Sequence, residues 1–258
     1  MKVVILAGGL GTRLSEETDI RPKPMVEIGG YPILWHIMKI YSYYGLNDFI
    51  ICLGYKGNLI KKYFTDLCLQ LSDFTVEINT GKTVILKDKT PNWKVTLVDT
   101  GPNTLTGGRL LRIKNLIEDE KFMMTYGDGV SDIDLKSLLS FHENHGKYAT
   151  LTAVRPPARF GVLNLTDSGR ITSFHEKPNG DGTWINGGFF VLNKEVFDYI
   201  GQDEPYFEDY PLTNLSKDGE LFAYRHNGFW RPMDTMSDKR FLENLWSNGK
   251  AEWKIWKD

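Results

Sequence analysis

The sequence lacks the marks of several large classes of protein. Its 258 residues contain only two cysteines, Cys52 and Cys68, which are too few for a disulfide framework and do not suggest a zinc site. Both lie in apolar stretches, so we expect buried thiols. The longest apolar runs fall short of the about 20 residues that a membrane helix needs, and Met1-Lys2 leads directly into an apolar run, which leaves no room for a signal peptide. We therefore expect a soluble, cytoplasmic protein with no membrane partner.

An excess of charge of one sign is also absent. The chain carries 31 Lys and Arg residues against 33 Asp and Glu residues, for a net charge of -2, and the two signs are mixed along its length. Because no basic stripe or tail stands out, no nucleic-acid partner is expected. A chain of this length can instead bury a full core as one large α/β domain.

A glycine-rich turn near the N-terminus lacks the two best-known glycine motifs. The apolar run at 3–7 is followed by GGLGTR, from Gly8 to Arg13. A dinucleotide fingerprint would need glycine where Leu14 stands, and a Walker loop would need Gly-Lys-Ser/Thr. Three glycines in four positions still allow a tight turn whose backbone N–H groups can cradle an anion, and Arg13 adds a forked positive charge that suits phosphate. The glycines alone leave both a bland strand-to-helix turn and a phosphate-binding loop open.

A lysine between two prolines follows this turn. Pro22 and Pro24 fix φ and disfavour helix, which predicts that Lys23 sits on a stiff, extended segment. A lysine held in this way loses less entropy when it binds a ligand. The alternative is a solvated surface lysine between loop prolines, but the glycine turn just before it favours a role in ligand binding.

Apolar strands alternate with amphipathic helices through the first half of the chain, which predicts a mostly parallel sheet flanked by helices. The strands are expected at 3–7, 48–54, 95–99 and 122–126, and the helices at 32–45, 57–71, 107–117 and 134–145, with Asp134 or a neighbour as a cap. Residues 72–94 interrupt this alternation with a hairpin of 74–78 and 83–86, for which a subunit contact or a lid is expected. Later elements are expected at 148–154, 161–165, 170–175, 185–192, 194 onward, 211–217, 221–226 and from about 237.

Seven stretches, taken in order and spacing, resemble the sugar-1-phosphate nucleotidylyltransferases over essentially the whole chain. They are GGLGTRL at 8–14, PKPM at 22–25, TGGRL at 106–110, Gly127-Asp128, Glu176-Lys177-Pro178, Asn186-Gly187-Gly188 and Asp234. The GFWRPMDTM stretch at 228–236, the insert after Leu71 and the TGGR variant look closest to the glucose-1-phosphate cytidylyltransferase branch of that family.

This resemblance implies a fold and a reaction. The implied fold is Rossmann-like, a mostly parallel mixed sheet flanked by helices as in nucleotide-diphospho-sugar transferases. It would form a single domain over 1–258, with a nucleotide-binding half of about 1–130, the insert at about 72–94, and a sugar-phosphate-binding half of about 131–258. The implied reaction converts CTP and α-D-glucose 1-phosphate to CDP-glucose and pyrophosphate with Mg²⁺, and in bacteria it feeds the synthesis of surface polysaccharide. A homo-oligomer, plausibly a hexamer, is also implied.

The resemblance implies a set of nucleotide-site residues. Arg13, Lys23 and Asp128 would be catalytic, and Asp128 and Asp234 would bind the metal. A triphosphate carries about four negative charges whereas a helix N-terminus offers about half a positive charge, so the glycine turn alone cannot neutralise it. Asp128 as a turn former and Asp234 as a helix cap are the alternatives. The nucleotide-binding residues would be Leu6, Ala7, Gly8, Gly9, Gly11, Thr12, Arg13, Lys23, Leu105, Thr106, Arg109 and Gly127.

The sugar phosphate would bind in the second half of the chain. Lys177 would bind its phosphate, while Glu176 and Asn186 would accept bonds from sugar hydroxyls. The implied set is Gly161, Glu176, Lys177, Asn186, Gly187 and Gly188. An ordinary surface charge pair at 176–177 and a β-bulge at 187–188 are the alternatives.

Base choice is the most open question. Family members that use UTP or dTTP usually carry a small residue where this chain has Arg109. Cytosine presents acceptors at O2 and N3, and arginine can only donate, so Arg109 at the base edge would favour cytosine. Arg109 on the triphosphate is an equal alternative. The rival functions are a uridylyl- or thymidylyltransferase acting on a sugar 1-phosphate, and a non-catalytic regulatory homologue.

Overall fold

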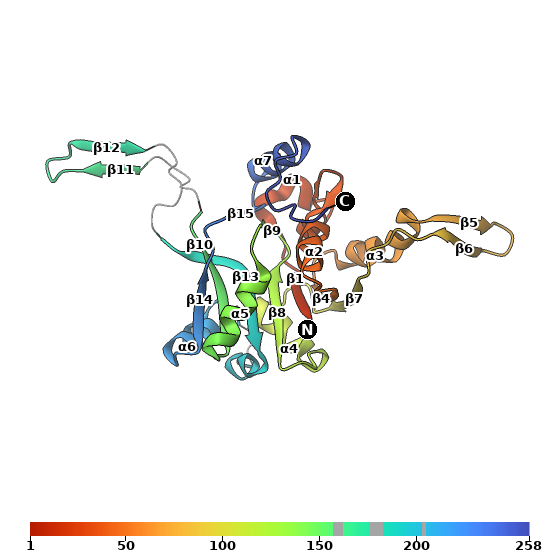
Figure 1. Ribbon diagram of the computed structural model, residues 1–258, viewed down its shortest axis with the longest axis horizontal. Helices are drawn as coiled ribbons and strands as arrows, with labels where there is room; N and C mark the ends of the chain where they lie inside the picture. The colour runs from red at the N-terminus through yellow and green to blue at the C-terminus, as the bar shows by residue number, and fades with distance from the viewer. Residues whose placement is uncertain (157–161, 176–182, 203–204, 258) are drawn as a thin grey trace.

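A computed structural model describes residues 1–156, 162–175, 183–202 and 205–257, with the backbone alone described at 13, 15, 162, 164, 165 and 175. Its centre is a seven-stranded sheet in the order β14-β10-β13-β8-β1-β4-β7 (Figure 1). These strands are β1 (Val3–Ala7), β4 (Asp48–Leu53), β7 (Lys94–Asp99), β8 (Lys121–Tyr126), β10 (Ala149–Val154), β13 (Ile185–Asn193) and β14 (Leu221–Arg225). Every neighbouring pair is parallel except the two that involve β13. The predicted mostly parallel mixed sheet is confirmed.

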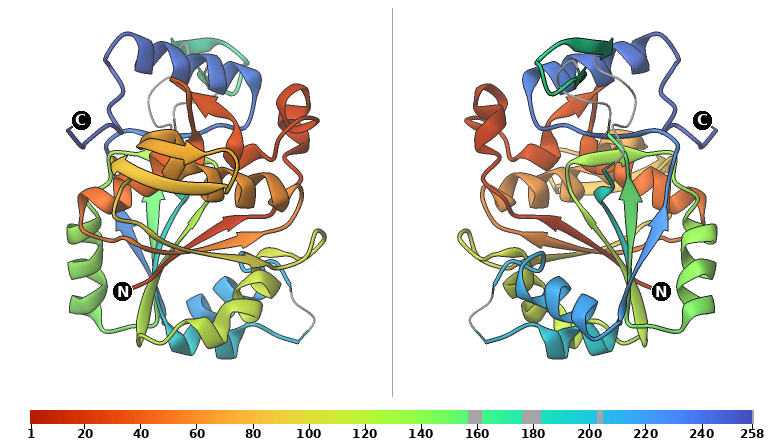
Figure 2. Two further views of the ribbon diagram at one scale, coloured as in Figure 1. Left: turned by 90° about the vertical axis from the view of Figure 1, so that its right-hand side faces the viewer. Right: turned by 90° about the vertical axis from the view of Figure 1, so that its left-hand side faces the viewer.

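Two apolar cores cover the two faces of this sheet, because successive strand side chains point to opposite faces. In β1, Val3 and Ile5 belong to one core, and Val4 and Leu6 to the other. Helices lie on both sides of the sheet (Figure 2). The first core is covered by α2 (Ile33–Tyr43), α3 (Gly57–Leu71), α5 (Leu135–His145) and α7 (Met236–Ser247), and the second by α4 (Thr106–Ile113), η4 (Lys194–Tyr199) and α6 (Tyr210–Lys217).

The ends of the helices follow local capping chemistry. Asp134 accepts hydrogen bonds from the backbone N–H groups of Lys136 and Ser137, which confirms it as the cap of α5. Before α7, Thr235 and Asp238 form a capping box, so Thr235 and not Asp234 is the cap there. Asp234 is thereby left to face the cavity described below.

Two hairpins extend from the body in opposite directions (Figure 1). The first, β5 (Asp73–Glu77) with β6 (Lys82–Lys87), is the hairpin predicted in the insert, and all its strand residues are exposed. The second, β11 (Val162–Leu165) with β12 (Ile171–His175), also matches its prediction. The remaining short elements are η1 (Thr12–Leu14), α1 (Ser15–Thr18), η2 (Lys23–Met25), β2 (Glu27–Ile28), β3 (Tyr31–Pro32), η3 (Lys114–Leu116), β9 (Gly129–Ser131) and β15 (Trp230–Pro232).

Two local predictions are wrong. Lys23 begins a short 3₁₀ turn instead of lying on an extended segment, since Met25 N–H donates to the Pro22 carbonyl at 2.8 Å. A proline in the first turn of a helix removes an N–H that has no partner there, so Pro24 does not oppose the turn. Cys68 is exposed because it lies on the open side of α3, whereas Cys52 is buried as expected. No helix among the described residues combines the length and apolarity that a membrane crossing needs.

Candidate active site

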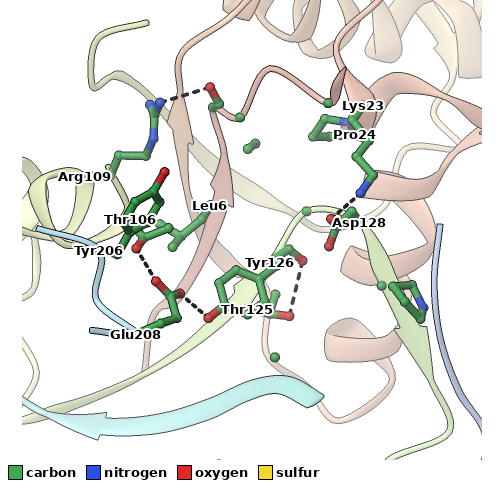
Figure 3. A pocket seen from close by; sticks show the side chains of 18 of the residues that line it. Leu6, Lys23, Pro24, Thr106, Arg109, Thr125, Tyr126, Asp128, Tyr206 and Glu208 are labelled. Atoms are coloured by element: carbon green, nitrogen blue, oxygen red, sulfur yellow. Dashed lines mark hydrogen bonds and ion pairs between the residues drawn. The ribbon is translucent and has the colours of Figure 1, made fainter. Parts of the chain in front are cut away.

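A cavity of about 930 Å³ opens at the edge of the sheet where β1 and β8 end. In the sheet, β1 lies between β4, the next sheet strand along the chain, and β8, so the strand order reverses at β1. Open α/β sheets bind ligands at such a reversal. Figure 3 shows Lys23 and Asp128 on one side of the cavity and Arg109, Thr106 and Glu208 on the other. The predicted site residues that line it are Leu6, Ala7, Gly8, Gly9, Gly11, Thr12, Lys23, Leu105, Thr106, Arg109, Gly127, Asp128, Asn186, Gly187, Gly188 and Asp234.

The structure does not describe the side-chain positions of four predicted site residues. Gly161, Glu176 and Lys177 lie outside the described residues, and for Arg13 only the backbone is described, in η1.

Each glycine of the turn after β1 has its own structural reason. Gly8 is buried, and a Cβ there would overlap the guanidinium of Arg109. Gly11 has a φ of 66°, in the left-handed region that favours glycine. Gly9 is exposed in the cavity wall with open space where a Cβ would stand. A ligand can therefore approach the backbone closely at Gly9.

Arg109 contacts the backbone ends of three neighbouring strands. Its side chain, on α4, is 4% exposed. The guanidinium donates to the carbonyls of Leu53 at 2.8 Å, Gly101 at 3.0 Å and Gly8 at 3.0 Å, and to the hydroxyl of Thr100 at 2.7 Å. Burial lowers the pKa of this guanidinium. In these contacts Arg109 ties the glycine turn to the carboxyl edges of β4 and β7, while its head group still lines the cavity.

A short ladder brings the two predicted metal ligands together. Asp128 follows β8, and Asp234 follows β15, which pairs with β9 so that Pro232 lies opposite Gly129. The N–H of Met233 also donates to the carbonyl of Asp128 at 2.8 Å. Two carboxylates that are far apart in the sequence therefore lie side by side at the mouth of the cavity.

Lys23 sits between these two carboxylates. Its Nζ donates to Oδ2 of Asp128 at 2.7 Å and to Oδ1 of Asp234 at 2.6 Å. Burial acts to lower the pKa of Lys23, but attraction by both carboxylates outweighs it and the pKa is raised. The lysine is therefore a permanent cation at neutral pH.

The two aspartates fit a magnesium ion. Both carboxylates contact the same positive group, the Lys23 ammonium, which shows that the space between them attracts a cation. Mg²⁺ in proteins usually takes one or two carboxylates and completes its octahedron with substrate oxygens and water. No group of three or more His, Cys, Asp or Glu side chains that could hold a metal occurs in the described ranges. A metal here would depend on these two carboxylates and on the ligand's own oxygens.

The glycines of β13 lie at an irregularity of the β10–β13 ladder, which is compatible with the β-bulge that the sequence allows for them. The β10–β13 register shifts between Leu151 and Ala153, and Gly188 has a φ of 79°. A Cβ on Gly188 would come within 2.6 Å of the ring of Tyr126. Trp230 Nε1 donates to the carbonyl of Gly187 at 2.7 Å. These glycines are therefore required by the packing of the chain itself, whether or not a sugar lies against them.

Several cavity residues carry no motif that reveals them in the sequence. Tyr126, Tyr206, Glu208 and Asp209 line the cavity. Glu208 accepts hydrogen bonds from Tyr126 Oη and, at 2.6 Å, from Thr106 Oγ1. Burial and the adjacent Glu208 raise the pKa of Tyr126. The position of Tyr126 directly before Gly127-Asp128 is the only signal that could have found it.

Comparison with known proteins identifies the family of this chain. A family model described as "Nucleotidyl transferase" matches residues 2–231. The chain is 57% identical to the glucose-1-phosphate cytidylyltransferase of Salmonella typhi over 99% of this chain and 100% of that one, and 49% identical, with the same coverage, to a Bacillus subtilis protein described as a probable glucose-1-phosphate cytidylyltransferase. The crystal structure of HddC from Yersinia pseudotuberculosis superposes with a TM-score of 0.69 at 25% identity, over 95% of this chain and 99% of that one. The chain therefore belongs to the nucleotidyl transferase family.

Proposed function

We propose that this chain is a glucose-1-phosphate cytidylyltransferase of the cytoplasm. It joins CTP and α-D-glucose 1-phosphate to give CDP-glucose and pyrophosphate. The observation that carries the proposal is the 57% identity to a protein of that name over essentially the full length of both chains. Both proposed halves of the domain, about 1–130 and 131–258, contribute strands to the same sheet, which supports a single catalytic unit.

The proposed chemistry is an in-line displacement. An oxygen of the sugar phosphate attacks the α-phosphorus of CTP, and pyrophosphate leaves, so catalysis rests on positioning and on charge neutralisation. Asp128 and Asp234 would hold a magnesium ion, which would supply positive charge to the phosphate oxygens. Lys23 and Arg13 supply further positive charge on the protein's side, and the open backbone at Gly9 lets the phosphates approach the turn.

Lys23 has a specific part in this proposal. Its ammonium lies within hydrogen-bond distance of both aspartates, and its side chain is only 12% exposed. Its charge is therefore little screened by water, and Lys23 is one of the residues that line the cavity. At the sugar end, Asn186 lines the cavity and Lys177 is proposed to bind the phosphate of glucose 1-phosphate.

Arg109 has two candidate direct roles within the proposed function. At the base edge its N–H groups would match the acceptors of cytosine, and at the triphosphate they would add charge. Its four contacts to carbonyls and a hydroxyl support an indirect contribution as well, because they fix the glycine turn at Gly8.

We also propose a homo-oligomer, a hexamer, that uses the β5–β6 hairpin. This hairpin exposes apolar side chains that include Ile78 at 88% and Leu86 at 67%. Exposed apolar patches of this kind mark protein interfaces. Light scattering should give the mass of several chains, and Leu86→Glu should lower it. A monomeric mass for the unchanged chain would refute the proposal.

The test of the enzymatic proposal is pyrophosphate release from a panel of nucleotides and sugar phosphates. We expect the highest kcat/KM for CTP with glucose 1-phosphate. A preference for UTP or dTTP would point to a sibling enzyme, and no release with any pair would point to a non-catalytic homologue.

A further inference from the structure

Glu208 lies at the junction of three elements of the cavity wall. It belongs to the segment 205–209 between η4 and α6, and both of its carboxylate oxygens accept hydrogen bonds. Thr106 Oγ1, at the start of α4, donates to Oε2 at 2.6 Å, and Tyr126 Oη, at the end of β8, donates to Oε1 (Figure 3). The same segment is fixed to α4 by two further hydrogen bonds, from Gly107 N–H to the Pro205 carbonyl at 3.0 Å and from Phe207 N–H to Thr106 Oγ1 at 2.8 Å.

A carboxylate in this place is unsuited to binding phosphate directly. The proposed substrates are both phosphate esters, and an anion facing them repels them. Glu208 also lines the cavity, but both of its oxygens accept hydrogen bonds from the neutral hydroxyls of Thr106 and Tyr126. Its effect on a ligand therefore passes through Thr106 and Tyr126.

The charge of Glu208 sets the direction of the hydrogen bonds. A carboxylate only accepts, so the proton of the Tyr126 hydroxyl must point to Glu208. The lone pairs of Tyr126 Oη are then available, and Asn186 Nδ2 donates to that oxygen at 3.3 Å. The bonds run in one direction, from Asn186 to Tyr126 to Glu208.

This direction fixes the amide of Asn186. Its Oδ1 accepts the N–H of Gly188 at 2.9 Å while its Nδ2 donates to Tyr126. A flip of the amide would place its NH₂ against the Gly188 N–H and its oxygen against the Tyr126 oxygen, so both hydrogen bonds would be lost. The amide NH₂ has two hydrogens, and only one of them is used by Tyr126. The second Nδ2 hydrogen is thereby presented in one orientation, as a donor for an oxygen of a bound ligand.

We propose that Glu208 is a positioning residue for the sugar-phosphate substrate, acting through Tyr126 on the amide of Asn186. This inference rests on the proposed function. Its second bond, to Thr106, holds the start of α4 at the nucleotide end of the same cavity. One carboxylate therefore links the two ends of the cavity. Its hydrogen bond to Tyr126, called the Tyr126 arm, and its hydrogen bond to Thr106, called the Thr106 arm, can be tested by different variants.

The test is a comparison of KM values for the two substrates in three variants. Glu208→Gln offers one acceptor and one donor where two acceptors stand, so one of the two hydroxyls must reverse its role and accept a hydrogen bond. Tyr126→Phe removes only the arm to Asn186, and we expect a rise of about 5- to 30-fold in KM for glucose 1-phosphate with a smaller change for CTP. Thr106→Val removes the bond to Glu208 together with the acceptor of the Phe207 N–H, and the larger rise should then be in KM for CTP.

Coupling between the residues distinguishes positioning from a general loss of fold. The double variant Glu208→Gln/Tyr126→Phe should raise the KM for glucose 1-phosphate no more than about the worse single variant, because both act through the same bond. Glu220→Gln is the matched control, since Glu220 is a half-buried carboxylate that pairs with Lys147 at 2.8 Å away from the cavity, and its KM values should stay at those of the unchanged chain.

The possible failures are distinguishable. If the unchanged chain forms no nucleotide sugar, the proposed function fails. If it is active and Tyr126→Phe leaves the KM for glucose 1-phosphate unchanged, or raises both KM values equally, the positioning role of Glu208 is refuted. Tyr126→Phe decides the matter even if Glu208→Gln does not fold, because it removes one oxygen and keeps the ring that packs on Phe190.

Discussion

Removal of Lys23 should tighten the binding of a divalent cation to the free protein, although the same change should reduce turnover. In the structure the Lys23 ammonium occupies the space between Asp128 and Asp234, at 2.7 and 2.6 Å. A metal that needs both carboxylates must first displace this ammonium. The protein's own lysine therefore competes with the metal.

The size of the effect follows from the two contacts that must break. A hydrogen bond to a charged group contributes about 1.5–3 kcal/mol. The two carboxylates are 32% and 22% exposed, so water recovers part of this loss and the lower end of the range applies. About 1.4 kcal/mol corresponds to a tenfold change in Kd. We expect Lys23→Met to bind Mn²⁺, used as a spectroscopic probe, at least about tenfold more tightly in the absence of nucleotide.

The assay is a titration of free Mn²⁺ by electron paramagnetic resonance. The matched control is Lys239→Met, which removes a cation that pairs with Glu17 and leaves the two aspartates unchanged. An equal gain in both variants would show a general effect of charge, and no gain in Lys23→Met would refute displacement of the lysine. Loss of Mn²⁺ binding in Asp234→Asn is required for the metal site itself.

Four further predictions concern other parts of the molecule. Asp128→Asn should abolish turnover far more than CTP binding measured by calorimetry; near-normal activity would count against the metal assignment. Lys177→Ala should raise the KM for glucose 1-phosphate with little change for CTP, whereas equal losses would remove its proposed role. Arg109→Ala should lower the CTP:UTP ratio of kcat/KM if it reads the base, and an unchanged ratio with lower activity would exclude that reading. Burial lowers the pKa of His36 from its usual 6.5 to about 4, so the folded protein favours the neutral imidazole. About 3 kcal/mol of stability, present above pH 6.5, should therefore be lost as the pH falls to 4. The free energy of unfolding, measured with urea between pH 6.5 and 4, should depend less steeply on pH in His36→Phe than in the unchanged chain. An equal pH dependence in the two proteins would contradict this.

The regular part of the fold could be predicted because its signals are local. The apolar spacing of 57–71 predicts a helix with the bounds that α3 has, and Asp134 is recognisable as a cap from its place before an amphipathic run. The alternation of strands and helices predicts parallel neighbours, as β1, β4 and β7 are, but it does not predict the order of the strands.

What could not be predicted depends on contacts between distant segments. The two readings of Arg109 rest on its chemistry alone, whereas its actual partners are carbonyls at the ends of three strands, which no sequence spacing reveals. Glu208 lies in a segment without glycine or a charged motif, and its importance arises only when Thr106 and Tyr126 meet it in space. The turn at Lys23 is hidden in the sequence because proline opposes the interior of a helix but is compatible with its first turn.

The short ladder between β9 and β15 has a consequence for the order in which the protein is synthesised. The glycine turn, Lys23 and Asp128 leave the ribosome well before Asp234, because the chain is made from its N-terminus. Until β15 pairs with β9, the lysine has only one of its two carboxylate partners, and the pair of aspartates does not exist. A nascent chain can therefore form its central strands and still be unable to gather a metal, so activity should be among the last properties that the growing chain acquires.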